Sequence, residues 1–240
     1  MKLSYSDIAR LLREDLKLAH IPIGMAFLED PPQGIKHYAE AVPTACTFWK
    51  AAERALFYAT AEDHYNCPIG AITQGFKLPD EVMQNALALI GQMGKLDYFH
   101  EAEARNVPTV QKEHRVIVYG PLEDFESLAA DLVLLIVTPF QAMLVSEATG
   151  GAAWEGGTPS AILGRPACAV IPSALNRNVA ASSYACMGAR TFAGVGEQEL
   201  LQAVPSAVLP RLAERLPKIL AANAAMKEYY AAKKAQFAQV

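Results

Sequence analysis

The chain has 240 residues, of which 52% are hydrophobic and 19% are charged, a composition that supports a full core and excludes a disordered protein. The 21 basic and 25 acidic residues give a net charge of −4, and the basic residues are dispersed along the chain. We therefore expect no nucleic-acid partner. We also expect no membrane attachment, because the most apolar run, Leu132 to Val137, is far shorter than the about 20 residues of a spanning helix.

The first quarter of the chain predicts a helix, a strand and a second helix. Residues 6–20 have apolar side chains at helical spacing behind a Ser6 or Asp7 cap. Residues 21–28 are predicted to form a strand, and an alanine-rich helix is predicted from Cys46 to Tyr58. The charged opening segment predicts no secretory signal, so we expect a cytoplasmic protein whose thiols stay reduced.

The middle of the chain alternates between helical and strand patterns. A long helix is predicted from Leu78 to about Met93, with Pro79 in its first turn. Strands are predicted at residues 115–120 and 132–137, the second buried on both faces because it lacks polar alternation. A helix is then expected over residues 141–148. This alternation predicts an α/β or α+β fold with a mixed sheet and helices.

The last third is predicted to begin with a glycine-rich loop over residues 150–157, which resembles a mobile flap beside a site. Residues 166–171 are predicted to form a strand or a strand running into a helix, and residues 174–181 a short helix or turn. A helix is expected from Glu197 to Val204. Residues 209–237 predict a helical tail broken by prolines, whose amphipathic end either packs on the body or joins a second subunit.

All four cysteines belong to two copies of one pattern, which is the most informative feature of the sequence. Each copy has an Ala-Cys pair, a second cysteine, and Gly-Ala-x-Thr shortly after it. The first copy contains Ala45-Cys46, Cys67 and Gly70-Ala71-x-Thr73, and the second contains Ala167-Cys168, Cys186 and Gly188-Ala189-x-Thr191. The pattern predicts one domain, residues 1–240, with pseudo-repeats at about 21–95 and 130–204 and a helical tail at 209–240. Equivalent loops of such a duplication would face one another across a pseudo-two-fold axis.

Four thiolates that converge would form a metal or iron–sulfur site. We expect a [4Fe–4S] cluster held by the four cysteines, with Gly70 and Gly188 keeping the backbone open beside the sulfurs and Arg190 balancing the charge of a cluster or anionic ligand. Cys168, which lies in an apolar run, is either a ligand or a buried core residue. The ligands are Cys46, Cys67, Cys168 and Cys186, or the same set without Cys168, which would leave one iron open for substrate.

Other readings of the cysteines remain open at the level of sequence. Structural zinc ranks lower because no C-x-x-C knuckle occurs in the chain. A redox pair of Cys67 with Cys186, or a cysteine nucleophile, would make the protein a thiol-based enzyme. His64, three positions before Cys67, is expected to be a solvated surface residue rather than a catalytic base. The alternative without cysteine chemistry is a non-catalytic small-ligand-binding module, in which the cysteines are core residues and the repeats form a ligand cleft.

The sequence resembles a prokaryotic family, the domain-of-unknown-function family number 169, over nearly the whole chain from Ile21 to Phe192 and beyond. The residues that carry the resemblance are Ile23 to Phe27, Cys46 with Ala51-Ala52, Cys67-Pro68-Ile69-Gly70, Pro139-Phe140-Gln141-Ala142-Met143, Cys168, and Ser183-Tyr184-Ala185-Cys186-Met187-Gly188-Ala189-Arg190. The family is frequent in anaerobic bacteria and archaea. The resemblance implies a cysteine-based site in anaerobic-type metabolism without naming a reaction.

These observations lead to one functional expectation. We expect an iron–sulfur protein with a redox or substrate-activating role, whose partner is a small-molecule substrate or an electron-transfer protein. A homodimer is a further expectation. The sequence identifies no catalytic residue and leaves open whether the protein is an enzyme.

Overall fold

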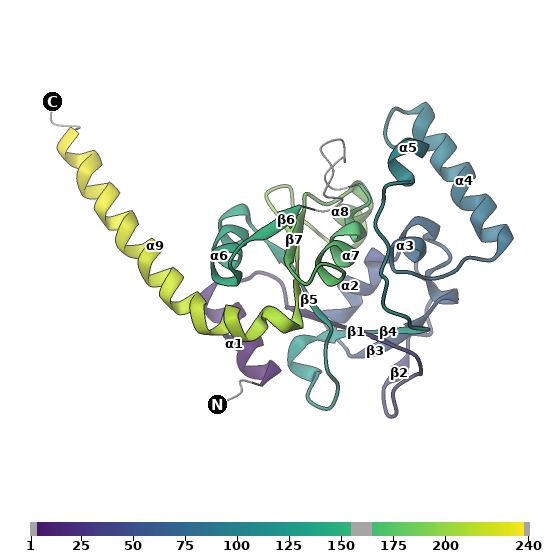
Figure 1. Cartoon of the computed structure of the whole chain (residues 1–240), viewed down its shortest axis with the longest axis horizontal. Coiled ribbons are helices and arrows are strands. Elements are labelled where there is room, and N and C mark those ends of the chain that lie inside the picture. The colour runs from purple at the N-terminus through teal and green to yellow at the C-terminus, as the bar shows by residue number, and fades with distance from the viewer. Residues whose placement is uncertain (1–3, 155–164, 238–240) are drawn as a thin grey trace.

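A computed structural model describes residues 4–154 and 165–237 and confirms the α/β class (Figure 1). Its centre is a mixed sheet of eight strands in the order β2-β3-β4-β1-β5-β8-β7-β6. The strands are β1 (Ile23–Leu28), β2 (Lys36–His37), β3 (Phe57–Thr60), β4 (Val116–Pro121), β5 (Leu132–Val137), β6 (Ala152–Trp154), β7 (Ala180–Ser183) and β8 (Leu200–Pro205).

Helices cover both faces of this sheet. The α-helices are α1 (Tyr5–Asp15), α2 (Cys46–Ala52), α3 (Pro68–Thr73), α4 (Asp80–Lys95), α5 (Glu101–Ala104), α6 (Pro139–Thr149), α7 (Val170–Leu175), α8 (Met187–Phe192) and α9 (Leu209–Phe237). Short 3₁₀ turns are η1 (Glu62–His64), η2 (Leu122–Asp124), η3 (Ala167–Ala169) and η4 (Ser206–Val208). Side chains of α1, α6 and α9 join the hydrophobic core on one face, and those of α2, η3, α7 and α8 join the core on the other.

The two halves of the sheet have the same strand order when each is read inward from its edge. The first half reads β2-β3-β4-β1 and the second reads β6-β7-β8-β5, so that β1 and β5 meet at the centre as an antiparallel pair. The outermost pair is parallel in both halves, and every other pairing is antiparallel. This correspondence is what internal duplication would produce, and it makes the first cysteine segment, between β2 and β3, equivalent to the segment between β6 and β7.

Alternation along the strands separates the two cores. On β1, Met25 and Phe27 point into the core that contains Cys46 and Cys168, whereas Ala26 points into the core beneath α6 and α9. Both strands of the central pair are almost fully buried. The cysteines therefore lie on one face of a rigid, doubly covered sheet.

Several predicted elements of the first half need correction at their ends. Helix α1 is capped by Ser4, whose hydroxyl accepts from the N–H of Asp7 while the Asp7 carboxylate accepts from the N–H of Ser4. It ends at Asp15 because Lys17 adopts a left-handed φ of 55°. Helix α2 ends at Ala52 rather than Tyr58, since Phe57 and Tyr58 pair with β4. Pro79 precedes α4 instead of lying in its first turn.

The second half departs further from the sequence-based prediction. Residues 167–175 form η3 and α7 rather than a strand, residues 180–183 form the unpredicted strand β7, and residues 200–205 form β8 where a helix was expected. The expected glycine-rich loop begins at Gly150, the C-cap of α6, and contains β6, whereas its last residues, 155–157, lie outside the described residues. Pairing with neighbouring strands overrides local propensity at β7, whose sequence AASS has no strong strand former.

Helix α9 continues through Pro217 instead of breaking there. Its first turns are buried through Leu209, Leu212 and Leu216, while its distal half extends away from the body (Figure 1). Within residues 4–154 and 165–237, no helix is both long enough and apolar enough to cross a membrane.

Candidate functional site

The structure places all four cysteines at the beginnings of helical segments on one face of the sheet. Cys46 is the first residue of α2, Cys67 immediately precedes α3, Cys168 lies in η3, and Cys186 immediately precedes α8. All four are free thiols. Cys46 and Cys168 are buried, whereas Cys67 and Cys186 are half-buried, so one side of the group is closer to solvent.

The four thiols are close enough to interact electrostatically across the two halves of the chain. The charge of each of the other three sulfurs contributes to raising the pKa of Cys46, after the larger effect of burial. Cys67 and Cys186 act in the same way on Cys168. The packing explains this proximity, because α2 contacts α8 and α3 contacts η3. The segment that begins at Cys46 therefore packs against the one that follows Cys186. The segment that follows Cys67 packs against the one that contains Cys168.

Cys67 lies in a tight backbone pocket. The backbone N–H groups of Ala45 and Gly70 lie close enough to its sulfur to offset part of the rise in its pKa caused by burial. A Cβ on Gly70 would lie 2.9 Å from the Cys67 sulfur and 2.9 Å from the Cβ of Ala45. Gly70 is therefore required for the close approach of the two cysteine segments, and its N–H is directed at a sulfur as the repeated glycine predicts.

The second copy has a looser arrangement around Cys186. A Cβ on Gly188 would lie 3.6 Å from the Cys186 sulfur, an ordinary van der Waals contact. Ala185 adopts a left-handed φ of 68°, which turns the chain sharply into the cysteine. The Arg190 guanidinium donates to the carbonyl oxygens of Tyr184 (2.7 Å) and Gly196, so it braces the loops on either side of α8. Its predicted contact with an anionic ligand stays a prediction.

Burial keeps the thiols of Cys46, Cys67 and Cys168 protonated when no metal is bound. Desolvation raises the pKa of Cys67 and raises those of Cys46 and Cys168 strongly. For Cys168, a hydrogen bond with the Thr73 hydroxyl acts in the opposite direction. Buried thiols of this kind are poor nucleophiles, and metal binding would have to displace their protons.

His64 is fully buried, so the expectation of a solvated surface histidine is wrong. Its Nδ1 lies 2.5 Å from the carbonyl oxygen of Thr60, and its Nε2 lies 3.0 Å from the Tyr119 hydroxyl. Desolvation lowers the pKa of His64 to about 4, so the ring is neutral, donates to Thr60 through Nδ1 and accepts from Tyr119 through Nε2. Both ring nitrogens are engaged away from sulfur, which argues against a Cys–His catalytic pair.

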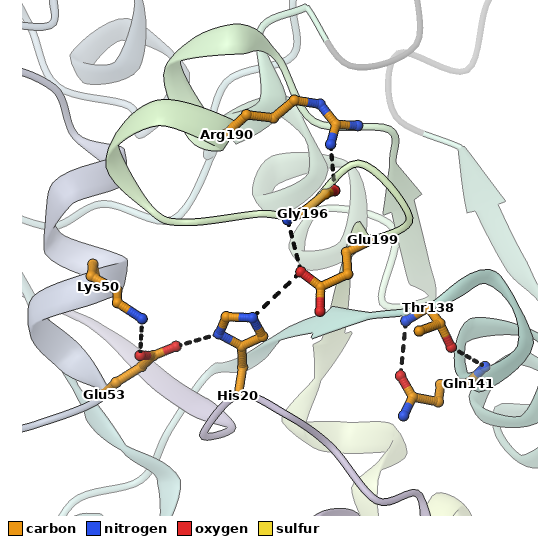
Figure 2. A network of polar contacts seen from close by, with 8 residues as sticks. All are labelled: His20, Lys50, Glu53, Thr138, Gln141, Arg190, Gly196 and Glu199. Carbon is orange, nitrogen blue, oxygen red and sulfur yellow. Dashed lines mark hydrogen bonds and ion pairs between the residues drawn. The ribbon is translucent and has the colours of Figure 1, made fainter.

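A polar network ties the far ends of α2 and α8 together (Figure 2). The His20 ring lies between Glu53, at 2.7 Å from Nδ1, and Glu199, at 3.4 Å from Nε2. Glu53 also pairs with Lys50 of α2 at 2.6 Å, and Glu199 accepts from the N–H of Gly196. The network therefore links α2 of the first half to the loop between α8 and β8 of the second half.

The segment between α4 and α5 reaches the half-buried side of the cysteine group. The Tyr98 hydroxyl accepts from the N–H of Met187, at 3.4 Å, directly beside Cys186. The guanidinium of Arg165 lies over the Tyr98 ring, 4.3 Å from its centroid, and donates to the Tyr98 carbonyl. Neither Tyr98 nor Arg165 carried a signal in the sequence.

The donor set fits an iron–sulfur cluster on two observations. Four free thiols from four segments lie on one face of the sheet, and two buried side chains on the segments that follow Cys46 and Cys67, Trp49 and Gln74, have polar atoms without a partner among the described residues. Across the described ranges, no group of three or more His, Cys, Asp or Glu side chains is positioned around a single metal ion. In a [4Fe–4S] cluster each cysteine binds a different iron, so the sulfurs need not meet at one point.

Most of the predicted site residues lie together, and Arg190 is the one whose guanidinium binds backbone carbonyls instead. The four cysteines, Gly70 and Gly188 belong to one site, and Arg190 braces it from the side. The residues that the sequence left unassigned are Trp49, Gln74 and Tyr119, although Thr73, which reaches Cys168, was already part of the repeated pattern. The pKa of the buried Tyr119 is raised by burial and by the charges of Cys168 and Cys46, which places its side chain beside the sulfurs.

The fold and site define an α/β protein with a four-cysteine centre at the contact between two topologically equivalent halves. The chain belongs to the DUF169 family, described as "Uncharacterised ArCR", whose model matches residues 11–215. It is also similar to an uncharacterised protein, MJ0308, of Methanocaldococcus jannaschii, with 27% identity over 173 residues that cover 68% of this chain and 71% of the relative. No solved structure matches the chain.

Proposed function

We propose that the protein is a cytoplasmic iron–sulfur protein that binds a [4Fe–4S] cluster through Cys46, Cys67, Cys168 and Cys186. The observation that carries this proposal is the grouping of all four thiols of the chain at one place, from segments far apart in sequence. Cysteines placed for packing alone would have no reason to gather in this way, because each behaves as a small hydrophobic residue that another apolar side chain could replace.

The arrangement favours a cluster over the alternatives. Zinc requires four ligands around one ion, whereas the described cysteines are not so arranged. A thiol-based enzyme requires a thiol with a lowered pKa, whereas burial raises the pKa of Cys46, Cys67 and Cys168. The matching strand order of the two halves is a further support, since it gives each cysteine a counterpart across the centre of the sheet.

The chain's own residues would perform three tasks around the cluster. The cysteines hold it, the N–H groups of Ala45 and Gly70 lower the pKa of Cys67 and so favour its thiolate, and the aromatic core below excludes water. A bound cluster supplies one-electron transfer or, at an iron without a cysteine ligand, Lewis-acid activation of a substrate. A small substrate or an electron partner would approach from the side of Cys67 and Cys186, where the group is half-buried.

Anaerobic purification tests the proposal directly. The protein should be brown, absorb broadly near about 400 nm, and contain about four iron and four sulfide per chain. Cys67→Ser and Cys186→Ser should each lose most of this iron, whereas Thr191→Val, an exposed site one and a half turns beyond Cys186, should retain it. Colourless, iron-free wild-type protein after anaerobic purification and reconstitution with iron and sulfide would refute the proposal.

The quaternary part of the proposal is a homodimer formed through the distal half of α9. Four large apolar side chains are exposed there, at Met226, Tyr229, Tyr230 and Phe237. Such a stripe is typical of a helix that packs against another helix. Sedimentation velocity of the wild type and of a Tyr229→Glu/Tyr230→Glu variant tests it, and a wild type that is monomeric at micromolar concentration would contradict it.

A further inference from the structure

Two fully buried side chains near the cysteines in sequence have polar atoms without a partner among the described residues. Gln74 is completely buried, yet neither the nitrogen nor the oxygen of its amide is hydrogen-bonded. Trp49 is equally buried, and its indole N–H is likewise without an acceptor. Buried donors are nearly always hydrogen-bonded in native proteins, because an unpaired one destabilises the fold. Two orphaned donors on the two segments that follow Cys46 and Cys67 indicate an acceptor that residues 4–154 and 165–237 do not supply.

Helical spacing places Gln74 on the face of α3 that carries Cys67. Cys67 is the N-cap and Gln74 the C-cap of α3, so at helical spacing positions 67, 70, 71 and 74 follow one side of the helix, with Gly70 and Ala71 between the two caps. Side chains of a helix lean toward its N-terminus, so the Gln74 amide leans toward the cysteine end of α3. On that side, α3 itself places nothing larger than the methyl group of Ala71 between Cys67 and Gln74. Thr73, the adjacent residue, already contacts Cys168.

Trp49 has the equivalent position on α2. It follows Cys46 by three residues, so both side chains lie on the same face of the helix one turn apart. Trp49, Cys46 and Cys168 belong to the same buried core. The first half of the chain therefore contributes two donors, one from each of its cysteine helices.

We propose that the Gln74 amide and the Trp49 indole donate hydrogen bonds to the sulfur atoms of the cluster, an inference that rests on the proposed function. Both are positioning residues that do not ligate iron. Donors to cluster sulfur stabilise the reduced form, which carries more negative charge, and so raise the reduction potential. In the cluster-free protein the same two donors are buried without an acceptor, which lowers the free energy of unfolding.

The test compares each variant in its iron-free and cluster-loaded forms. Gln74→Met removes the orphaned amide at similar volume, so it should raise the thermal unfolding midpoint of the iron-free protein by roughly 2–6 °C. In the loaded protein it should remove a hydrogen bond, so the extra stabilisation conferred by the cluster becomes smaller and the reduction potential moves to more negative values. Trp49→Phe should shift the potential in the same direction.

Gln202 provides a matched control, because it is also fully buried but its amide nitrogen has partners, the Ala142 carbonyl and the Ser146 hydroxyl, on the opposite face of the sheet. Gln202→Met should lower the midpoint equally in both forms and leave the potential unchanged. In the NMR spectrum of the wild type, the indole N–H resonance of Trp49 should shift or broaden when the cluster is loaded. This measurement does not depend on the folding of any variant.

The outcomes separate the two proposals. Wild-type protein without iron overturns the proposed function and this inference together, and the iron assay alone reveals it. Wild-type protein with a full cluster, but with potentials that do not change in Gln74→Met and Trp49→Phe and an unperturbed Trp49 resonance, overturns this inference alone. A loss of stability in Gln74→Met that is equal in the iron-free and loaded forms also overturns it.

Discussion

The hydroxyl of Thr73 lies close enough to Cys168 to hold the pKa of that thiol below the value that burial alone would give, so a residue of the first cysteine repeat faces a cysteine of the second. The same hydroxyl also donates to the carbonyl of Ile69, 2.7 Å away, which fixes its rotamer at the last turn of α3. The corresponding residue of the second repeat, Thr191, is exposed. The two copies of Gly-Ala-x-Thr thus have the same sequence and different roles, which makes them a natural pair for comparison.

Thr73→Val should weaken the contact between the halves while Thr191→Val should not. Valine keeps the volume of threonine but removes the buried hydroxyl, so we expect a loss of about 1 kcal/mol in the free energy of unfolding and faster loss of iron from the loaded protein. Urea unfolding and an iron-release time course measure the two effects. Equal behaviour of the two variants would show that Thr73 has no special role at Cys168.

Gly70→Ala should damage the site, whereas Gly188→Ala should be tolerated. The added methyl group at Gly70 meets the Cys67 sulfur and the Ala45 Cβ at 2.9 Å each, and these are backbone-anchored neighbours that cannot move aside alone. We expect a loss of about 1–3 kcal/mol and poor cluster incorporation. At Gly188 the one neighbour within range among the described residues is the Cys186 sulfur at 3.6 Å. Thermal unfolding and iron content of the two variants provide the comparison, and full iron occupancy in Gly70→Ala would contradict the geometry.

The sequence predicts the first half of this fold better than the second, for a physical reason. Strand β5 is recognised because its apolar run is flanked by breakers, and Cys46 begins a helix because alanines follow it. Strands β7 and β8 are missed, since AASS lacks strand formers and a buried Gln202 interrupts an otherwise apolar run. Both strands are held by their neighbours in the sheet, which single-sequence propensity does not contain.

The candidate site shows the same division. The repetition around the cysteines predicts that they associate. It also predicts a role for Gly70, because a glycine next to a reactive or ligating side chain allows the backbone to approach it closely. The burial of His64 and the position of Tyr119 beside the sulfurs depend on the pairing of β3 with β4, so a linear pattern does not reveal them. The orphaned donors of Trp49 and Gln74 appear only when the partners of every buried polar atom are known.

The His20 network predicts a stability effect away from the cysteines (Figure 2). His20→Leu leaves the carboxylates of Glu53 and Glu199 facing an apolar side chain, and both are mostly buried, with 12% and 19% of their side chains exposed. We expect a loss of about 1–3 kcal/mol in the free energy of unfolding, and a smaller loss in His20→Gln, which retains one donor.

His100→Leu is the control for this comparison, because its pair with Asp97 is exposed and should contribute less than about 1 kcal/mol. Denaturant unfolding at constant pH measures all three variants. A His20→Leu protein as stable as the wild type would show that the network does not hold α2 to the loop after α8.

Acid should destabilise the iron-free protein through His64. The pKa of this buried ring is about 4 in the folded protein, against 6.5 for an ordinary histidine, because burial disfavours the charged form. Between these values the unfolded chain binds the extra proton and the folded chain does not, so stability is complete above pH 6.5 and decreases as the pH falls toward 4. The total effect is on the order of 3 kcal/mol.

His64→Gln should remove the part of the pH dependence that comes from His64, because glutamine does not titrate. The variant should also be less stable at neutral pH, because the hydrogen bonds to Thr60 and Tyr119 are disturbed. Urea unfolding from pH 7 to pH 4 measures the slope for the wild type, His64→Gln and the exposed control His100→Gln. The wild type and His100→Gln should lose stability in parallel, and the curve of His64→Gln should be flatter. Parallel curves for all three proteins would show that His64 is charged in the fold, and the neutral ring that accepts from Tyr119 would then be wrong.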